Sequence, residues 1–238
     1  MPMSVKLIDF VGTPGSGKST VSHIIAEKLR GRGYSVSEPT YDSERKLSVK
    51  MRVLYKLKCT VLCSLNPKKS PRKIIAQIPD SCFKSKKEKL KQYVNLCFII
   101  KCLSAKNNTD YIIADQGIVQ AAVSLCTHCP ADSIPNNLIA QISRSAGITP
   151  TVIHISTGSI ERNLEYLERR ASNYSRVDQI NSVEGKISAL KEVQSVIDAI
   201  LVQCGSYCSY ISDMPADSPQ KQSETDKLVL HIINNDRT

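Results

Sequence analysis

The stretch VKLIDFVGTPGSGKST, from Val5 to Thr20, joins a short apolar run to a glycine-rich loop. The apolar run predicts a buried parallel strand. The loop from Gly12 to Ser19 fits the pattern G-x-x-x-x-G-K-[ST], in which backbone N–H groups and a helix N-terminus surround a phosphate. Because the motif stands between a predicted strand and a predicted helix, it indicates a phosphate-binding loop in an α/β fold.

The residues of this loop would contact different parts of a bound nucleotide. Lys18 should reach the β- and γ-phosphates of ATP, and Ser19 should ligate Mg²⁺. The glycines allow successive N–H groups to curl around the phosphates. The expected nucleotide-binding set is Gly12, Thr13, Pro14, Gly15, Ser16, Gly17, Lys18, Ser19 and Thr20.

Two carboxylates stand at the ends of predicted strands, where ligands of open α/β sheets bind. Asp115 ends the apolar run of DYIIADQG, and we expect it to hold Mg²⁺ directly or through water. Glu38 ends YSVSEP and could accept the proton of an attacking hydroxyl. The alternatives are a helix cap for Asp115 and a solvated strand end for Glu38.

The segment ERRASNYSRVD, residues 168–178, carries three arginines in a polar stretch between two helices. We expect this segment to act as a lid that brings Arg170 and Arg176 to the transferring phosphate. The alternative is that the arginines of this segment pair with Glu165 and Glu168 along a helix.

Strand and helix patterns alternate along the chain, which implies right-handed βαβ units and a parallel sheet covered on both faces. With no internal repeat and no linker, residues 1–238 are expected to form one domain. Gly147 and Ser159 should mark a helix end and a helix start. The predicted strands are residues 5–12, 34–39, 110–117, 151–156 and 207–212, and the main predicted helices outside the basic segment are 18–33, 118–126, 136–147, 159–170, 183–204 and 223–234.

A basic helical insertion is predicted at residues 45–106. It contains seventeen Lys or Arg against only Asp80 and Glu88, a net +15 in a chain whose total is +10. Such a surface suits a polyanionic partner, although a solvated helical face with a lysine-rich loop explains the charge equally well.

Two helices are predicted within the insertion. Asp42 or Ser43 should cap the first, and the second should cover residues 85–106. Lys50 and Lys58 fall within the apolar stripe of the first helix, where they would have to reach a cleft or extend to its edge. The stripe is Leu47, Met51, Leu54, Leu57, Val61 and Leu65, and that of the second helix is Leu90, Tyr93, Val94, Cys97, Ile100 and Leu103.

The nine cysteines favour reduced, buried thiols over disulfides, because the count is odd and no secretion signal is visible. CTHC, from Cys126 to Cys129, has the spacing of a metal-ligand pair. A second pair could come from Cys59 and Cys63 or from Cys204 and Cys208, but these suit buried positions as well. No apolar stretch is long enough to predict a membrane span, so we expect a cytoplasmic protein.

The order of these motifs resembles that of the thymidylate kinase and deoxynucleoside kinase group. The most specific piece is TVIHISTGSIERNLEYLERRASNYSRVD, and the likeness covers residues 4–43 and 109–234. The resemblance implies a P-loop NTPase three-layer sandwich with a five-stranded parallel sheet in the order 2-3-1-4-5. It further implies ATP as donor, an acceptor beside the loop, the region of Asp213 and Pro215 near the adenine, and compatibility with a homodimer.

Two positions depart from the family pattern on the acceptor side. Thymidylate kinases usually have an acidic residue where this chain has Pro14, and an arginine where it has Gln116. We therefore expect an ATP-dependent phosphotransferase whose acceptor is a nucleoside, a nucleotide or another small molecule. The alternatives are a kinase of a sugar, a glycan or a nucleic-acid end, and a P-loop ATPase or regulatory binding protein.

Overall fold

A parallel sheet of five strands forms the centre of the molecule in the computed structural model, which describes residues 5–66, 71–104, 109–169, 177–205, 207–211 and 219–234. The strand order is β2-β3-β1-β4-β5, and every pairing is parallel. The strands are β1 (Lys6–Val11), β2 (Val36–Ser37), β3 (Tyr111–Ala114), β4 (Pro150–Ser156) and β5 (Tyr207–Ile211). The expected fold class and strand order are confirmed, and β2 is shorter than the run 34–39 expected for it.

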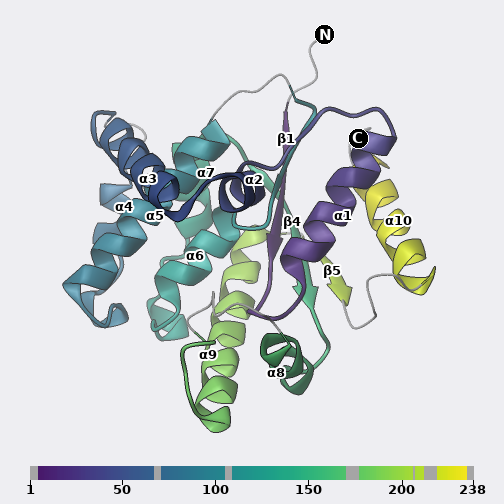
Figure 1. Cartoon of the computed structure of the whole chain (residues 1–238). Coiled ribbons are helices and arrows are strands. Elements are labelled where there is room, and N and C mark those ends of the chain that lie inside the picture. The colour runs from purple at the N-terminus through teal and green to yellow at the C-terminus, as the bar shows by residue number, and fades with distance from the viewer. Residues whose placement is uncertain are drawn as a thin grey trace.

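Helices cover both faces of this sheet, as Figure 1 shows. Side chains alternate along β1, so that Leu7 and Val11 pack on one face while Ile8 and Phe10 pack on the other. Helices α1 (Lys18–Gly31) and α10 (Pro219–Asn234) cover the face of Ile8 and Phe10. The opposite face is covered by α5 (Lys86–Ser104), α6 (Ile118–Cys126), α7 (Leu138–Ala146) and α9 (Val183–Leu201).

Two helix ends in the second half of the chain, at Gly147 and Ser159, lie where the sequence predicts them. Gly147 follows α7 with φ of 74°, a left-handed conformation that suits glycine. The Ser159 hydroxyl accepts a hydrogen bond from the Arg162 N–H (3.2 Å) and caps α8 (Ile160–Glu168). The short helices η2 (Ala131–Ser133) and η3 (Val202–Cys204) complete this half.

The basic segment begins with two helices where one was expected. Helix α2 (Pro39–Lys46) starts directly after Glu38, because proline fits the first position of a helix. Helix α3 (Val49–Ser64) begins after a break at Leu47, and the Ser48 hydroxyl caps it. The prediction that Asp42 or Ser43 caps this helix is therefore wrong. Helix α4 (Arg72–Ala76) and η1 (Asp80–Cys82) lead to α5.

The apolar stripe of α3 faces outward, contrary to the usual behaviour of such a stripe. The helix packs on α5 through a different face, where Cys59 and Cys63 are buried and the Cys63 thiol donates to the Cys97 carbonyl (3.4 Å). On α5, Leu90 is exposed, but Cys97, Ile100 and Leu103 reach the core as expected. The outward side chains of α3 and its C-terminal cap are at least half exposed: Met51, Leu54, Leu57, Val61 and Leu65.

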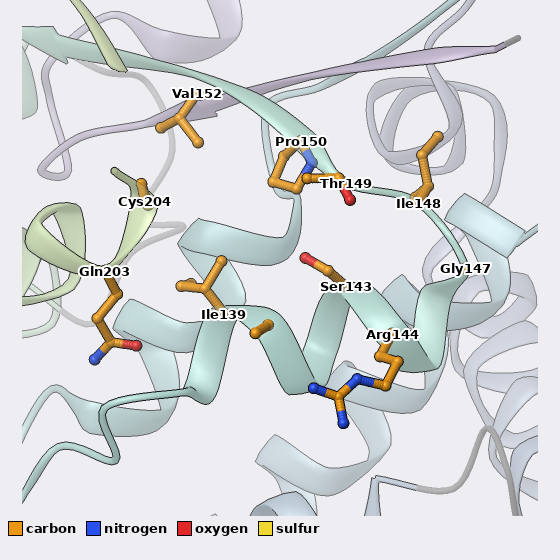
Figure 2. A pocket seen from close by; sticks show the side chains of 11 residues that line it. Ile139, Ser143, Arg144, Gly147, Ile148, Thr149, Pro150, Val152, Gln203 and Cys204 are labelled. Carbon is orange, nitrogen blue, oxygen red and sulfur yellow. The ribbon is translucent and has the colours of Figure 1, made fainter. Parts of the chain in front are cut away.

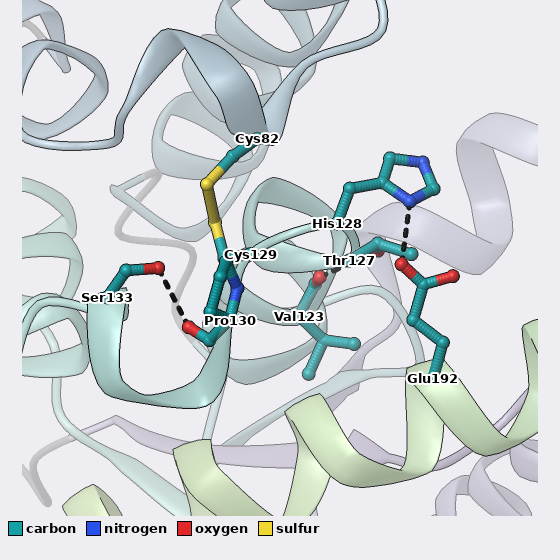
Figure 3. The surroundings of a disulfide bond; sticks show 8 residues. All are labelled: Cys82, Val123, Thr127, His128, Cys129, Pro130, Ser133 and Glu192. Atoms are coloured by element: carbon teal, nitrogen blue, oxygen red, sulfur yellow. Dashed lines mark hydrogen bonds and ion pairs between the residues drawn. A yellow bond between two sulfur atoms is a disulfide. The ribbon is translucent and has the colours of Figure 1, made fainter.

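One pair of cysteines departs from the expected reduced state. Cys82 and Cys129 form a disulfide, with Cα atoms 4.8 Å apart (Figure 3). The other seven are free thiols, and five of them are buried. Burial raises the pKa of the Cys126 thiol to about 12. Because Cys129 is bonded in the disulfide, the CTHC sequence offers one thiol rather than the ligand pair of a structural zinc site.

Within the described ranges, no helix combines the length and the apolar character that crossing a membrane requires.

Candidate active site

The phosphate-binding loop connects the end of β1 to the start of α1. Gly15 and Gly17 have φ of 88° and 83°, the left-handed region in which side chains are strained. Gly12 lies so close to the Ile155 carbonyl that a Cβ would overlap it. The sequence therefore needs glycine at these positions to turn the backbone around an anion.

Lys18 extends across the loop that precedes it. Its side chain is largely buried, and its ammonium donates to the carbonyls of Gly12 (2.8 Å) and Thr13 (3.1 Å). The ammonium charge is thus held within the concave side of the loop, where the phosphates of a nucleotide would lie.

Ser19 and Asp115 come together at the edge formed by the carboxyl ends of the strands. The Ser19 hydroxyl donates to the Asp115 carboxylate (2.7 Å), and Thr40 at the start of α2 donates to the other carboxylate oxygen (2.8 Å). Asp115 is buried. A hydroxyl beside a carboxylate is the donor set that Mg²⁺ prefers, so these residues fit the expected ion. Thr40 was not anticipated, because it belongs to no motif that would place it beside Asp115, 75 positions away.

The loop is braced from β4 and α8 by residues that the sequence analysis also missed. The Asn163 amide donates to the Thr13 hydroxyl (2.8 Å), and the Thr157 hydroxyl donates to the Asn163 side-chain oxygen (2.8 Å). All three side chains are buried. The chain of hydrogen bonds fixes the loop to the element that precedes the expected lid.

Glu38 is less accessible than its expected role requires. Its buried carboxylate forms an ion pair with Arg30 (2.8 Å) and contacts Nδ1 of His23 (3.1 Å), whose ring stacks on Tyr41. Tyr41 lines the cavity beside the loop, whereas Glu38 does not. Glu27 lies close to the same cluster, but Arg30 pairs with both carboxylates and supplies the positive charge there.

Asp9 is a second buried carboxyl that the apolar pattern of β1 conceals. One oxygen accepts from the Val119 N–H (2.8 Å), and the other has no partner among the described residues. Gly117 packs directly against it, so a Cβ there would overlap the carboxyl group. Burial, with a smaller contribution from the charge of Asp115, raises the pKa of Asp9 to about 7.

A cavity of about 1150 Å³ opens beside the loop. Lys18 and Ser19 lie at its donor end, and Gln116 and Gln120 lie on its wall. Three cationic side chains from the first half of the chain also line it, namely Arg45, Arg52 and Lys84. The remaining lining residues are Pro14, Gly17, Thr20, Tyr41, Val123, Ser124, Thr127, His128, Val177, Ile180, Gly185, Ser188, Ala189, Glu192 and Val193.

The three cations belong to the predicted basic segment, but the sequence did not single them out. The lysines expected to reach a cleft, Lys50 and Lys58, do not line this cavity. Arg52 does so from α3, because its position on the helix turns it toward the body of the protein. Pro14 and Gln116, the two departures from the family pattern, both line the cavity.

The expected lid is described only in part. Arg170 and Arg176 lie outside the described residues. Arg169 forms an exposed pair with Glu165 (3.8 Å), which is the alternative noted for the arginines of this segment. At the far end of the segment Val177 lines the cavity. The expected contacts of Asp213 and Pro215 also fall outside the described residues.

A separate cavity of about 560 Å³ lies at the opposite edge of the sheet, where β4 begins at Pro150 (Figure 2). Its walls come mainly from α7 and β4. It contains none of the expected site residues that the structure describes, and the phosphate-binding loop lies at the other end of the strands.

Comparison with known proteins supports the fold. No protein-family model and no curated protein matches this sequence. Deoxyadenosine kinase from M. mycoides, solved with dCMP and a flexible dCDP, has 15% identity and a TM-score of 0.50, covering 96% of this chain and 99% of its own. Shikimate kinase from Acinetobacter baumannii, solved with shikimate, has 14% identity and a TM-score of 0.50, covering 98% and 95%. The chain therefore has the fold of small-molecule P-loop kinases over nearly its whole length.

Proposed function

We propose that the protein is an ATP-dependent phosphotransferase whose acceptor is a small molecule with an anionic group. One observation carries the proposal: a single cavity is lined by Lys18 and Ser19 at one end and also by Arg45, Arg52 and Lys84. The first pair suits the donor phosphates, and the three cations suit a negative charge on the acceptor.

The donor side follows from the loop. Its N–H groups and the Lys18 ammonium bind and orient the phosphates of ATP. Ser19 and Asp115 would hold Mg²⁺, which when bound neutralises phosphate charge and orients the phosphates. Thr40 keeps the Asp115 carboxylate turned toward Ser19 through its hydrogen bond.

The acceptor side of the proposal rests on the positive charge of three side chains that line the cavity. Within the described part of the chain, no carboxylate lies within ion-pair distance of Arg45, Arg52 or Lys84. Glu192, which lines the same cavity, is paired with His128 (2.9 Å; Figure 3). A guanidinium presents a planar fork of donors that matches phosphate and carboxylate, so a phosphorylated acceptor complements these side chains. A nucleoside monophosphate is the first candidate.

The lid arginines and Glu38 complete the proposal as predictions. Arg170 and Arg176 would approach the transferring phosphate when the segment closes. Glu38 would need to leave its pair with Arg30 before it could accept a proton from the acceptor. If Glu38 only fixes the start of α2, Glu38→Gln should lower thermal stability more than turnover.

The test is a comparison of matched acceptors that differ in one phosphate. ADP release is measured with nucleosides and their 5′-monophosphates, with phosphorylated and free sugars, and with short oligonucleotides. We expect turnover only with anionic acceptors. Arg52→Ala should raise the acceptor KM by about tenfold to a hundredfold, the loss of one or two charge-assisted hydrogen bonds, without changing the KM for ATP. Lys50→Ala, on the outer side of the same helix, is the matched control and should behave as the wild type.

Three results would contradict this proposal. Equal turnover of a nucleoside and its monophosphate would show that the acceptor needs no anionic group. An Arg52→Ala enzyme with an unchanged acceptor KM would show that the acceptor does not bind at Arg52. ATP hydrolysis at one rate with every compound would favour the P-loop ATPase alternative.

A further inference from the structure

Within the described residues, helix α3 is covered on one side only. Its main packing partner among the described elements is α5, and in Figure 1 it lies at the outer margin of the molecule. The buried side uses Cys59 and Cys63. The opposite side, called the outer face of α3 below, carries residues that share one side of a helix: Lys50, Met51, Leu54, Leu57, Lys58, Val61 and Leu65.

The apolar part of this outer face is unusually exposed. Met51, Leu54, Leu57 and Val61 have exposed fractions of 50–59%, and Leu65 reaches 75%. Neighbouring apolar residues on the flanks of the helix add to the patch, because Val49, Val53 and Leu62 are exposed as well. A group of exposed apolar side chains on one face of a water-facing helix marks an interaction surface.

Cations interrupt the apolar patch at Lys50 and Lys58. Lys50 and Lys58 are exposed, and within the described ranges neither has a carboxylate at ion-pair distance. The segment 45–106 contains only two acidic residues, and one of them, Asp80, pairs with Lys89. The partner of this face must therefore cover apolar side chains and supply negative charge.

These two requirements distinguish between partners. A second copy of the chain packed through α3 would bring lysines toward lysines with no carboxylate between them. A nucleic acid would balance the charge but would leave the leucines without apolar contacts. An anionic bilayer meets both requirements, because aliphatic side chains enter the interface while lysine stems extend to the lipid phosphates.

We propose that the outer face of α3 docks the protein on the surface of an anionic lipid bilayer. The apolar residues enter the headgroup boundary, and Lys50 and Lys58 contact lipid phosphates. This docking is independent of the proposed phosphotransfer, since none of these residues lines the cavity beside the phosphate-binding loop. It also gives a role to Lys50 and Lys58, two charges of the basic segment that do not line the active-site cavity.

The test uses the full chain and vesicle co-sedimentation. Vesicles of phosphatidylcholine alone are compared with vesicles containing about 30 mol % phosphatidylglycerol. We expect binding to the anionic vesicles only, weakened when NaCl is raised from about 0.1 to 0.5 M. Lys50→Gln with Lys58→Gln should lower the partition coefficient about 30-fold, which corresponds to about 1 kcal/mol for each lysine.

The apolar contribution is tested separately. The triple variant Leu54→Ser, Leu57→Ser, Val61→Ser should lose at least tenfold in binding to anionic vesicles while keeping the wild-type melting temperature. A matched triple elsewhere on the surface, Val183→Ser, Val202→Ser, Leu230→Ser, replaces residues that are also exposed and should bind as the wild type.

Several outcomes would overturn the proposal. Failure of the wild type to sediment with anionic vesicles would do so directly. Unchanged binding by the outer-face triple would show that charge alone acts, as for a general polyanion. A wild-type dimer in light scattering that the same triple converts to a monomer would assign the face to a second copy of the chain.

Discussion

Replacing Asp9 by asparagine should stabilise the protein at neutral pH. Its carboxyl is fully buried in β1, where it accepts one hydrogen bond from the Val119 N–H. Burial raises its pKa from 3.8 to about 7. The folded chain therefore binds the proton of Asp9 more tightly than the unfolded chain does, and ionisation of this group opposes folding.

The size and direction of the effect follow from this shift. At pH values below 3.8 the carboxyl is protonated in both states, and the stability that the proton provides is fully present. As pH rises from 3.8 through about 7, that stability is lost, at about 1.4 kcal/mol for each pH unit. The wild type can lose at most about 4 kcal/mol of unfolding free energy in this way near pH 8. Relaxation of the protein around the charge reduces this loss toward about 1–2 kcal/mol.

The measurement is urea unfolding of wild type and Asp9→Asn followed by circular dichroism from pH 4.5 to pH 8. The difference in the free energy of unfolding should be small at the acidic end and grow with pH in favour of the variant. Asp80→Asn, at a fully exposed carboxyl, is the control and should leave the pH slope in this range unchanged. Parallel curves for wild type and Asp9→Asn, or a variant that is less stable at pH 8, would refute the reasoning.

Three further predictions concern metal binding, backbone conformation and the disulfide. Thr40→Val removes the hydroxyl that fixes the metal-site carboxylate, so turnover should need more Mg²⁺, and an unchanged Mg²⁺ titration would contradict this. Gly147→Ala should lower stability by roughly 1–2 kcal/mol because of its positive φ, whereas Gly31→Ala should be neutral or slightly stabilising, as comparative thermal unfolding will check. Reduction of the Cys82–Cys129 bond should lower the free energy of unfolding by about 2–4 kcal/mol, and thiol titration of the unreduced, denatured chain should count seven thiols rather than nine.

The central sheet and the donor end of the site could be predicted from the sequence, because their signals are local. A strand, a glycine-rich loop and a helix start are adjacent in the chain, and Asp115 follows its own apolar run. The parallel pairing then brings the ends of β1 and β3 to one edge of the sheet. Ser19 and Asp115 consequently meet although 96 positions separate them.

The contacts that could not be predicted depend on how distant helices turn relative to the sheet. In the sequence, Asp9 is a single polar residue within an apolar strand. Only the packing of α6 against β1 in the structure shows how deeply its carboxyl is buried. The stripe of α3 indicates an apolar face but not which face meets α5, and the cysteine face is the one that packs. Arg52 likewise reaches the cavity because of that helix rotation, which leaves no trace in sequence spacing.

The most direct test of the account is transfer of isotopically labelled γ-phosphate from ATP, followed by mass spectrometry of the products. The panel contains nucleoside monophosphates, phosphorylated sugars and small carboxylates, each with its neutral counterpart. We expect labelled product from an anionic acceptor with the wild type and none with Lys18→Ala. Label found only in inorganic phosphate with every acceptor, or a Lys18→Ala enzyme that transfers as well as the wild type, would contradict this expectation.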